Sequence, residues 1–395
     1  MSRPLRVAWI HDRAASSGGI ERYIQETARA LCREGVESTL LYDVAASPAP
    51  EPAFLAPFTA AFPTIDLERQ LADLAPDVVY VHRARDPGVA AALARSPFPV
   101  VRFFHDHELF CLRTHKYTAL ERRTCTKTIG AGCYACLGFV TRAPSFPSIQ
   151  LVSVGALKRR QRQAQSSRAY VVASSYMADH IREHGFDAAR TFVLPLFSEP
   201  PAVAPDPDRR HDRRLLVTGL VSTGKGIDVL LQALALMKEP ANVDVVGDGP
   251  QRLRFRNLAR RLGLASRVTF HGWASSTRLD THYREATALV FPSRAPETFG
   301  LVGIEAMSYG LPVVASDVGG VREWLRPDET GLLVPPSDAA ALARACDRVL
   351  ASPELARRLG GRGRAEHQTR FLTRHHVSRL LDVFEQVAGA ERKAA

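Results

Sequence analysis

Two glutamates eight positions apart, Glu297 and Glu305, are the densest chemical signal in this sequence of 395 residues. They lie in Phe291-Pro-Ser-Arg-Ala-Pro-Glu-Thr-Phe-Gly-Leu-Val-Gly-Ile-Glu305, where a predicted strand ends near Pro292 and a helix begins around Gly300. The first amides of a helix have no partner within it and favour a phosphate group. Here they are the amides of Phe299, Gly300, Leu301 and Val302. The segment therefore predicts a site for a phosphorylated ligand.

The two glutamates suit different hydroxyl groups of such a ligand. Glu305, about one turn into the helix, would hold a diol such as that of ribose with both carboxylate oxygens. Glu297, in the preceding loop, would reach a sugar hydroxyl beyond the phosphates. The alternative is structural, because acidic side chains near a helix start also compensate the helix dipole. For the two glutamates alone, these interpretations weigh about equally.

The residues around the glutamates resemble the signature of the retaining glycosyltransferases grouped as family 4, which have the GT-B fold. The matching positions are Pro292-Ser293, Glu297, Phe299-Gly300, Glu305-Ala306-Met307, Gly310–Ala315, Gly319-Gly320, Glu323 and Gly331–Val334. A coincidence over this many positions is implausible. The resemblance implies transfer of a sugar from a nucleotide-diphosphate sugar with retention of configuration, through an oxocarbenium-like transition state. It leaves the identity of the sugar open.

The loop Gly219…Lys225-Gly226 extends the resemblance, since the family has there a lysine that neutralises the diphosphate. A lone lysine is otherwise a solvated surface group, but this one follows a predicted strand. The family commonly has an arginine after the first glycine, where this chain has Leu220, and Arg294 is a candidate replacement for that cation. Gly249 lies in a turn that matches the family on the nucleotide side and is interpreted as mainly structural.

Two features of the first half also resemble the family. Ser17-Gly18-Gly19 precedes a predicted helix and is similar to the glycine loop that faces the donor phosphates and the acceptor, although any tight turn uses such glycines. His105 ends the predicted strand Val100–His105, and strand ends are where such folds bind ligands. The resemblance implies that His105 bonds to the donor sugar and orients the leaving group. The alternative is a plain structural histidine.

The resemblance makes His105, Glu297 and Lys225 the candidate catalytic residues. It implies that the leaving diphosphate itself takes the proton of the acceptor, without a catalytic metal or cofactor. The protein then contributes positioning, together with stabilisation of the charge on the diphosphate by Lys225 and the helix amides.

A cluster of cysteines lies outside the family pattern, in an insertion over about residues 107–140. Its members are Cys111, Cys125, Cys133 and Cys136. Four thiols with one Cys-x2-Cys pair predict a structural zinc site in a cytosolic protein. Iron–sulfur ligation by the same residues and four buried small hydrophobic side chains are the alternatives. Because His105 is near, we expect the insertion to shape the acceptor pocket.

Alternating apolar strands and amphipathic helices predict an α/β protein of two Rossmann-like, doubly wound domains that face a cleft, as in the GT-B fold. The resemblance makes residues 1–199 the acceptor-binding domain and 200–375 the donor-binding domain. A helix over 376–395 is expected to pack back on the N-terminal domain. The proline-rich stretch Pro200–Arg210 is typical of an interdomain linker. Strands are expected at Leu5–Ile10, Thr39–Tyr42, Val78–His82, Val100–His105, Val171–Ser174, Phe192–Leu196, Leu215–Thr218, Val243–Val246, Val268–His271, Ala288–Phe291, Pro312–Ala315 and Gly331–Val334.

The composition, 46% hydrophobic and 24% charged, excludes a disordered or fibrous protein. The net charge of +11 is spread over both halves of the chain, with basic runs at Lys158–Arg162 and Arg252–Arg261. No nucleic-acid motif accompanies these runs, so no nucleic-acid partner is expected. Contact with an anionic membrane and a merely solvated helix face weigh equally. Since no targeting or spanning segment is seen, we expect a cytoplasmic protein, with the inner face of the cytoplasmic membrane as the other location.

The expected function is that of a retaining glycosyltransferase with a saccharide or lipid-linked acceptor, in the synthesis of a cell-surface polysaccharide or glycoconjugate. The alternatives are a GT-B nucleotide-sugar epimerase or glycogen-type transferase and a non-catalytic protein that binds sugar nucleotides. The combination of Glu297, Glu305, Lys225 and His105 argues against the non-catalytic alternative.

Overall fold

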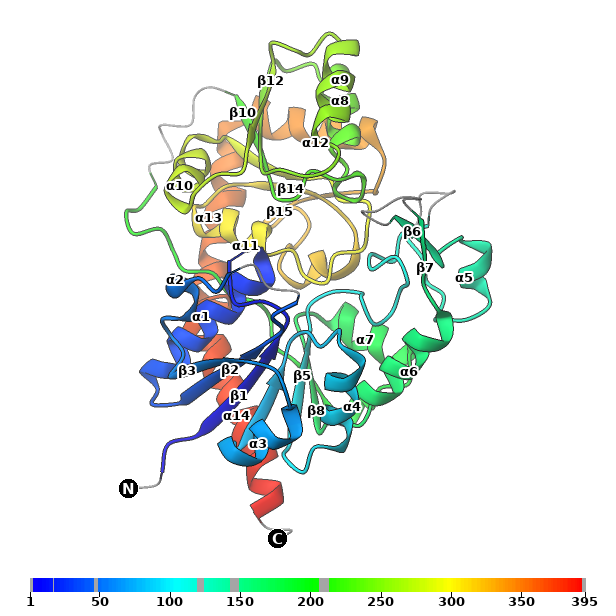
Figure 1. Cartoon of the computed structure of the whole chain (residues 1–395). Helices are drawn as coiled ribbons and strands as arrows, with labels where there is room; N and C mark the ends of the chain where they lie inside the picture. The colour runs from blue at the N-terminus through cyan, green and yellow to red at the C-terminus, as the bar shows by residue number, and fades with distance from the viewer. Residues whose placement is uncertain are drawn as a thin grey trace. The chain divides into compact units, whose positions relative to one another are not determined.

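The computed structural model describes residues 3–16, 18–45, 49–118, 124–142, 149–205 and 213–392. Over these residues the chain divides into two compact units (Figure 1). The first unit comprises Met1–Thr114, Thr126–Leu196 and Thr373–Ala395, and the second comprises His115–Cys125 and Phe197–Leu372. The chain therefore passes from the first unit to the second after residue 196 and returns after residue 372, in each case three residues before the expected boundary. Residues 206–210 of the expected linker lie outside the described residues.

A parallel sheet forms the centre of the first unit and contains, within the described ranges, seven strands in the order β3-β2-β1-β4-β5-β8-β9. The order of its first five strands is that of a doubly wound sheet. These strands are β1 (Arg6–His11), β2 (Glu37–Tyr42), β3 (Ala60–Pro63), β4 (Val78–Val81), β5 (Val100–Phe104), β8 (Ala169–Val172) and β9 (Thr191–Val193). The helices that accompany them are α1 (Gly19–Arg33), α2 (Pro52–Leu55), α3 (Leu67–Leu74), α4 (Pro87–Arg95), α6 (Val154–Ala164) and α7 (Ser175–Glu183).

Several helices of the first unit begin at short polar side chains that accept a hydrogen bond from the helix backbone. Asp66 caps α3, Asp86 caps α4 and Ser153 caps α6. Between β5 and α6, the segment of the predicted insertion contains α5 (Gly132–Ala135), and the antiparallel pair of β6 (Val140–Arg142) and β7 (Ile149–Leu151) follows it. Residues 119–123 of that insertion are not among the described ones.

The second unit repeats the same plan with a sheet whose described part contains six parallel strands in the order β12-β11-β10-β13-β14-β15. They are β10 (Arg214–Thr218), β11 (Asn242–Val246), β12 (Val268–Gly272), β13 (Ala288–Phe291), β14 (Val313–Ser316) and β15 (Gly331–Val334). The helices and 3-10 turns are η3 (Thr223–Lys225), α8 (Ile227–Leu236), α9 (Arg252–Arg261), α10 (Ser276–Glu285), α11 (Leu301–Ser308), η4 (Gly319–Glu323), α12 (Ala339–Ala351) and α13 (Pro353–Arg370). The predicted α/β class of two doubly wound domains is confirmed.

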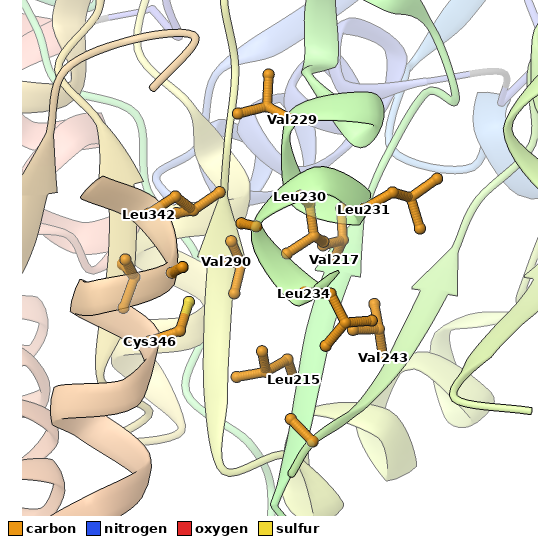
Figure 2. Packing of buried hydrophobic residues seen from close by; sticks show 14 of the residues in the cluster. Leu215, Val217, Val229, Leu230, Leu231, Leu234, Val243, Val290, Leu342 and Cys346 are labelled. Atoms are coloured by element: carbon orange, nitrogen blue, oxygen red, sulfur yellow. The ribbon is translucent and has the colours of Figure 1, made fainter. Parts of the chain in front are cut away.

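Figure 2 shows the core of the second unit, where α8 and α12 pack on the sheet. Leu230 and Leu234 of α8, Leu215 of β10 and Cys346 of α12 are each completely buried. Because helices cover the sheet, its central strands β10 and β13 are continuous apolar runs rather than alternating ones. Each such side chain contributes roughly 1.5–3 kcal/mol by leaving water. This packing fixes the strand ends from which the functional loops extend.

The C-terminal helix α14 (Thr373–Arg392) belongs to the first unit, where it packs against α1 and β4. Its His376 lies 2.7 Å from the hydroxyl of Tyr23, which in turn lies 2.9 Å from the hydroxyl of Tyr80. The ring of Phe384 packs edge-on against Tyr80. The last helix is thus tied to residues near the start of the chain. Within the described residues, no helix is long and apolar enough to cross a membrane.

Candidate active site

Lys225 and Glu297 lie just after neighbouring strands of the second sheet. β10 is followed by η3, which ends at Lys225, and β13 is followed by the loop that carries Glu297. The strand order reverses between β10 and β13, which is the point where doubly wound sheets bind ligands. The Lys225 Nζ lies 2.8 and 3.0 Å from the two carboxylate oxygens of Glu297. The structure therefore brings two of the predicted catalytic residues together as an ion pair.

Glu297 is held through both its side chain and its backbone. Ser293 Oγ donates to Oε1 at 2.6 Å, and the Gly320 amide donates to the Glu297 carbonyl at 2.7 Å. A Cβ on Gly319, whose φ is +54°, would lie 2.1 Å from that carbonyl oxygen, so only glycine fits there. The Glu297 side chain is 14% exposed and that of Lys225 is 34% exposed. A partly exposed ion pair adds little to stability, which favours a binding role for this one.

Glu305 is buried in the second turn of α11, where it is 7% exposed. Its Oε2 accepts a hydrogen bond from the hydroxyl of Tyr283 on α10 at 2.9 Å. The Tyr283 ring stacks on Tyr309, with centroids 4.9 Å apart. No acidic residue occupies the first turn of this fully described helix. Compensation of the helix dipole therefore does not account for Glu305.

The start of α11 matches the predicted helix start. Gly300 is the N-cap residue with φ +100°, a conformation that glycine adopts without strain, and Leu301 and Val302 follow as the first helical residues. Phe299 is fully buried, and its carbonyl accepts a hydrogen bond from Trp324 Nε1 at 2.7 Å. The backbone that precedes the helix is therefore fixed in place. Phosphate binding by these amides stays a prediction.

The loops that carry Gly219 and Gly249 pair through their backbones. The Gly219 amide donates to the Val246 carbonyl at 3.0 Å, and the Val221 amide donates to the Asp248 carbonyl at 2.9 Å. The two loops follow β10 and β11, so they lie at the same edge of the sheet as Lys225. These contacts explain the loop geometry, and a nucleotide contact of either glycine stays a prediction.

Arg294 does not supply the second phosphate cation. Its Nη1 lies 2.8 Å from Asp228 Oδ2, and its Nε donates to Ser337 Oγ at 3.2 Å. The residue is 8% exposed. The expectation that Arg294 replaces the family's arginine is therefore wrong, because its guanidinium is buried in an ion pair of its own. Leu220, at the family's arginine position, is exposed.

In the first unit, His105 follows β5 directly and lies against His82, which follows β4. His82 Nδ1 and His105 Nε2 are 2.7 Å apart, so one ring donates a hydrogen bond to the other. Burial holds the pKa of both rings well below its ordinary value. Both imidazoles are therefore neutral at pH 7 and can donate and accept hydrogen bonds, as a sugar hydroxyl requires.

Gly18 is the N-cap residue of α1, Gly19 is its first residue, and Ser17 is not described. Glu21 in the first turn has its Oε1 3.3 Å from His11 Nε2. Burial acts to raise the pKa of Glu21, but hydrogen bonds from His11 and the backbone lower it to about 2. The helix start thus already carries a negative charge, which suits a hydroxyl group better than a phosphate. The predicted contact of Gly18 and Gly19 with the donor phosphates stays untested.

A polar cavity of about 560 Å³ opens at the carboxyl ends of β1 and β4, lined in part by His11, Asp12, Asp66 and Arg85. Arg85 also pairs with Glu108 at 2.9 Å, and Arg160 donates to the other oxygen of Glu108 at 2.8 Å. Burial acts to raise the pKa of Glu108, but these two arginines bring it below its ordinary value. This ion-pair network fixes one wall of the cavity.

The structure does not bring the four cysteines together as a metal site. Cys111, Cys125, Cys133 and Cys136 are free thiols, each partly buried. Among the described side chains, the group whose ligand atoms all lie within 4.8 Å of one another is formed by other residues, Asp244, His271 and His282. The Cys-x2-Cys pair spans the single turn of α5, whereas the backbone of Cys125 is tied to the carbonyl of Lys116. The predicted zinc and iron–sulfur ligation therefore has no geometric support.

Three partners of the predicted residues were missed from sequence. Ser293 stands in the family frame and orients Glu297, His82 ends a predicted strand and bonds to His105, and Tyr283 holds Glu305. The strand-end position of His82 was a usable signal, since strand ends carry ligand-binding groups. Nothing in the sequence links Tyr283 to Glu305, because they come from different helices.

Comparison with known proteins agrees with this geometry in both units. Residues 17–197 match the model of the Glycosyltransferase Family 4 domain, and residues 207–366 match that of Glycosyl transferases group 1. The D-inositol 3-phosphate glycosyltransferase of Streptomyces bingchenggensis is 36% identical over 191 residues, which are 45% of this chain and 41% of the relative. The matched part thus spans less than half the length of this curated relative.

Two crystal structures illustrate the fold. The sucrose-phosphate synthase of Thermosynechococcus elongatus aligns over 98% of this chain and 100% of its own, with a TM-score of 0.72 at 23% identity. Anabaena Alr3699/HepE in complex with UDP-glucose aligns over the same shares, with a TM-score of 0.71 at 18% identity. With its two doubly wound units and the domain matched in each, the chain belongs to the glycosyltransferases of the GT-B fold, family 4 type.

Proposed function

We propose that this protein transfers a sugar, with retention of configuration, from a nucleotide-diphosphate sugar to a saccharide or lipid-linked acceptor, in the synthesis of a cell-surface polysaccharide or glycoconjugate. The observation that carries the proposal is the Lys225–Glu297 ion pair at the strand-order reversal of the second sheet. The names of the relatives and the UDP-glucose complex of the Anabaena protein support a nucleotide-sugar donor.

The second unit would bind the donor. Glu305, held by Tyr283, would accept the two hydroxyls of the ribose, and the first amides of α11 would face the diphosphate. The arriving diphosphate would compete with Glu297 for the ammonium group of Lys225. As Lys225 turns to the phosphate, the carboxylate of Glu297 becomes available to the hydroxyls of the sugar. Binding of the diphosphate, which is the leaving group, thereby completes the binding site for the sugar that is transferred.

In the transfer step, the bond between the anomeric carbon and the diphosphate oxygen breaks. A bond from the acceptor oxygen to the same face of that carbon forms, and the acceptor proton goes to a phosphate oxygen. Lys225 stabilises the negative charge that grows on the diphosphate as the bond breaks. The neutral imidazole of His105 would bond to a hydroxyl of the sugar without adding a charge that competes with Lys225.

The first unit would bind the acceptor in the 560 Å³ cavity beside His11 and Arg85. That volume suits one or two sugar rings, since small-molecule sites span roughly 300–1,000 Å³. For a lipid-linked acceptor, the exposed face of α9 would rest on anionic headgroups, because it presents Leu253, which is 72% exposed, together with Arg254 and Arg260. The run Lys158–Arg162 is less suited, since Arg160 is engaged with Glu108.

The test is a thermal-shift screen of the full chain against UDP-, GDP-, ADP- and TDP-sugars. A ligand that binds the folded state raises the unfolding temperature by mass action, so one nucleotide should stand out. NMR of the product made with that donor and a panel of acceptors should then show the anomeric configuration of the donor. Release of an isomer or free sugar without acceptor would favour the epimerase. Absence of a shift with every donor would contradict the proposal.

A further inference from the structure

One carboxylate and two imidazoles form a cluster in the second unit that the proposed transfer does not use. Asp244 lies on β11, His271 on β12 and His282 on α10. One ligand atom from each lies within 4.8 Å of the other two. Because three different elements supply the residues, the fold and not a local sequence motif creates the cluster.

Asp244 is already fixed in the position of a ligand. The residue is 4% exposed, and its Oδ2 accepts a hydrogen bond from Arg214 Nη1 at 3.1 Å. Its Oδ1 lies 2.7 Å from Nε2 of His271. Because Oδ2 is hydrogen-bonded to Arg214, Oδ1 is the oxygen that faces His271. An arginine that orients a carboxylate from behind is the kind of outer contact that metal ligands have.

The two imidazoles face each other at short range. The ring centroids of His271 and His282 are 4.4 Å apart at an angle of 59°. His282 Nδ1 is buried and, within the described residues, has no hydrogen-bond partner. A buried ring nitrogen without a partner is unfavourable, and each such atom calls for an explanation.

We propose that Asp244, His271 and His282 bind a divalent transition-metal ion such as Zn²⁺, Co²⁺ or Ni²⁺. Two imidazoles and one carboxylate are the donors that these ions prefer, whereas Mg²⁺ and Ca²⁺ prefer oxygen alone. The ion replaces the proton that now joins His271 Nε2 to Asp244 Oδ1. The His271 side chain is 30% exposed, which leaves a path for the ion and room for a water ligand.

The bound ion would tie α10 to two strands, β11 and β12, that the sheet already pairs with each other. It would connect β12 at the edge of the sheet with its neighbour β11 and with α10. Residue 283, next to His282 on α10, is the tyrosine that holds Glu305. The proposal does not depend on sugar transfer, because its ligands and its readouts are separate from Lys225 and Glu297.

The experiment uses the full chain, stripped of metal by dialysis against a chelator and titrated with Co²⁺ while the visible absorption is recorded. We expect one ion per chain and the ligand-field bands of cobalt bound by nitrogen and oxygen. Zn²⁺ should displace the cobalt and abolish the bands. His271→Ala and His282→Ala should each weaken zinc binding at least about tenfold, since loss of even an outer-shell partner costs roughly 10–100-fold.

Two control variants test whether zinc binds at the proposed residues and not elsewhere in the chain. His375→Ala, a matched substitution in the first unit, should leave zinc affinity unchanged, as should Cys133→Ser combined with Cys136→Ser. Hydrogen exchange of α10 should slow on zinc addition in the parent chain and not in His282→Ala. Circular dichroism verifies folding, and Asp244→Asn gives a second test if a histidine variant unfolds. Absence of binding, or binding lost with the cysteines and retained in both histidine variants, would overturn the proposal.

Discussion

The two units use the same sheet topology but carry different candidate ligand-binding residues at their strand ends. In the second unit, the strand-order reversal carries a charged, partly exposed pair, Lys225 and Glu297. In the first, the ends of β4 and β5 carry two neutral imidazoles, the buried His82 and the half-buried His105. A charged lysine suits a diphosphate, whereas neutral donors and acceptors suit sugar hydroxyls. The fold supplies the position, and the residues at the strand ends decide which ligand it takes.

Glu297→Gln tests the charged pair and has the largest expected effect. The substitution keeps the shape and removes the charge that Lys225 and the sugar share, so we expect kcat/KM for transfer to fall about 10³-fold. Thermal stability should change little because the pair is partly exposed. Glu239→Gln, which breaks the surface ion pair with Arg213, is the matched control and should transfer normally. Unchanged transfer in Glu297→Gln would remove this residue from the mechanism.

His105→Asn tests the neutral pair. We expect transfer to fall about 10²-fold, since a preorganised hydrogen bond to the sugar is lost. Binding of the free nucleotide diphosphate, measured by calorimetry, should not change. Burial holds the pKa of His105 well below its ordinary value, so this residue should produce no step in the rate between pH 6 and 8. A step near pH 6.5 that disappears in His105→Asn would contradict a neutral imidazole.

Acid should destabilise the first unit before the second. Burial lowers the pKa of His376 to about 4, so the unfolded chain, with its pKa near 6.5, binds the proton more readily. The stability associated with this residue is complete above pH 6.5 and is lost as the pH falls towards 4, about 2 kcal/mol of it by pH 5. Burial also lowers the pKa of His82 and His105, so their protonation likewise reduces the stability of this unit as the pH falls.

Hydrogen exchange at pH 7 and pH 5 measures this difference for each unit separately. Exchange of α14 should accelerate more than exchange of α12, after correction for the intrinsic rate. His376→Gln should reduce the pH dependence of α14. In the second unit, burial lowers the pKa of His367 to about 4 as well. Equal acceleration in both units would show that the histidines of the first unit do not set the difference.

Tyr283→Phe separates nucleotide binding from sugar binding within the second unit. The substitution removes the hydrogen bond to the Glu305 carboxylate and should weaken nucleotide binding about tenfold, as hydrogen bonds to charged groups contribute roughly 1.5–3 kcal/mol. Tyr309→Phe is the matched control, because its hydroxyl bonds to Asp280 at 2.7 Å and not to Glu305. Equal losses of nucleotide affinity in both variants would show that binding depends on the stacked rings of Tyr283 and Tyr309 and not on the hydrogen bond to Glu305.

The basic helices give the smallest expected effect. Arg260→Gln on α9 should reduce co-sedimentation with anionic vesicles about fivefold or less, since one arginine contributes roughly 1 kcal/mol at such a surface. Arg159→Gln on α6 is the matched substitution in the first unit and should have a smaller effect. Vesicles without anionic lipid should bind neither protein. If the parent chain does not bind anionic vesicles, the basic face of α9 is only a solvated helix surface.

The sequence predicted strands best where apolar runs are bounded by proline or glycine. The run Ala288–Phe291 before Pro292 was predicted with the ends that the structure has. The edge strand Ala60–Pro63 was missed, because it contains no β-branched residue and ends in proline. GT-B family membership, predicted from the frame around Glu297, is confirmed by the two domain models.

The sequence predicted individual residues of the candidate site but not the contacts between them. That Glu297 pairs with Lys225 depends on two strands that lie side by side although the residues are 72 positions apart. Arg294 was misassigned because its partner Asp228 is distant in sequence, so its burial could not be read from the local pattern. The group of Asp244, His271 and His282 has no motif at all, since it exists only after β11, β12 and α10 have assembled.

The return of α14 to the first unit has a consequence for synthesis of the protein. The second unit is essentially complete once residue 372 has left the ribosome, whereas the first lacks α14 until residues 373–392 emerge. Domains generally fold in the order in which they are synthesised, and here the unit that begins the chain is the last to be finished. Until then Tyr23 and Tyr80 lack the cover of His376 and Phe384. A nascent chain stalled before residue 373 would therefore expose an aromatic surface on its first domain, where a chaperone would bind.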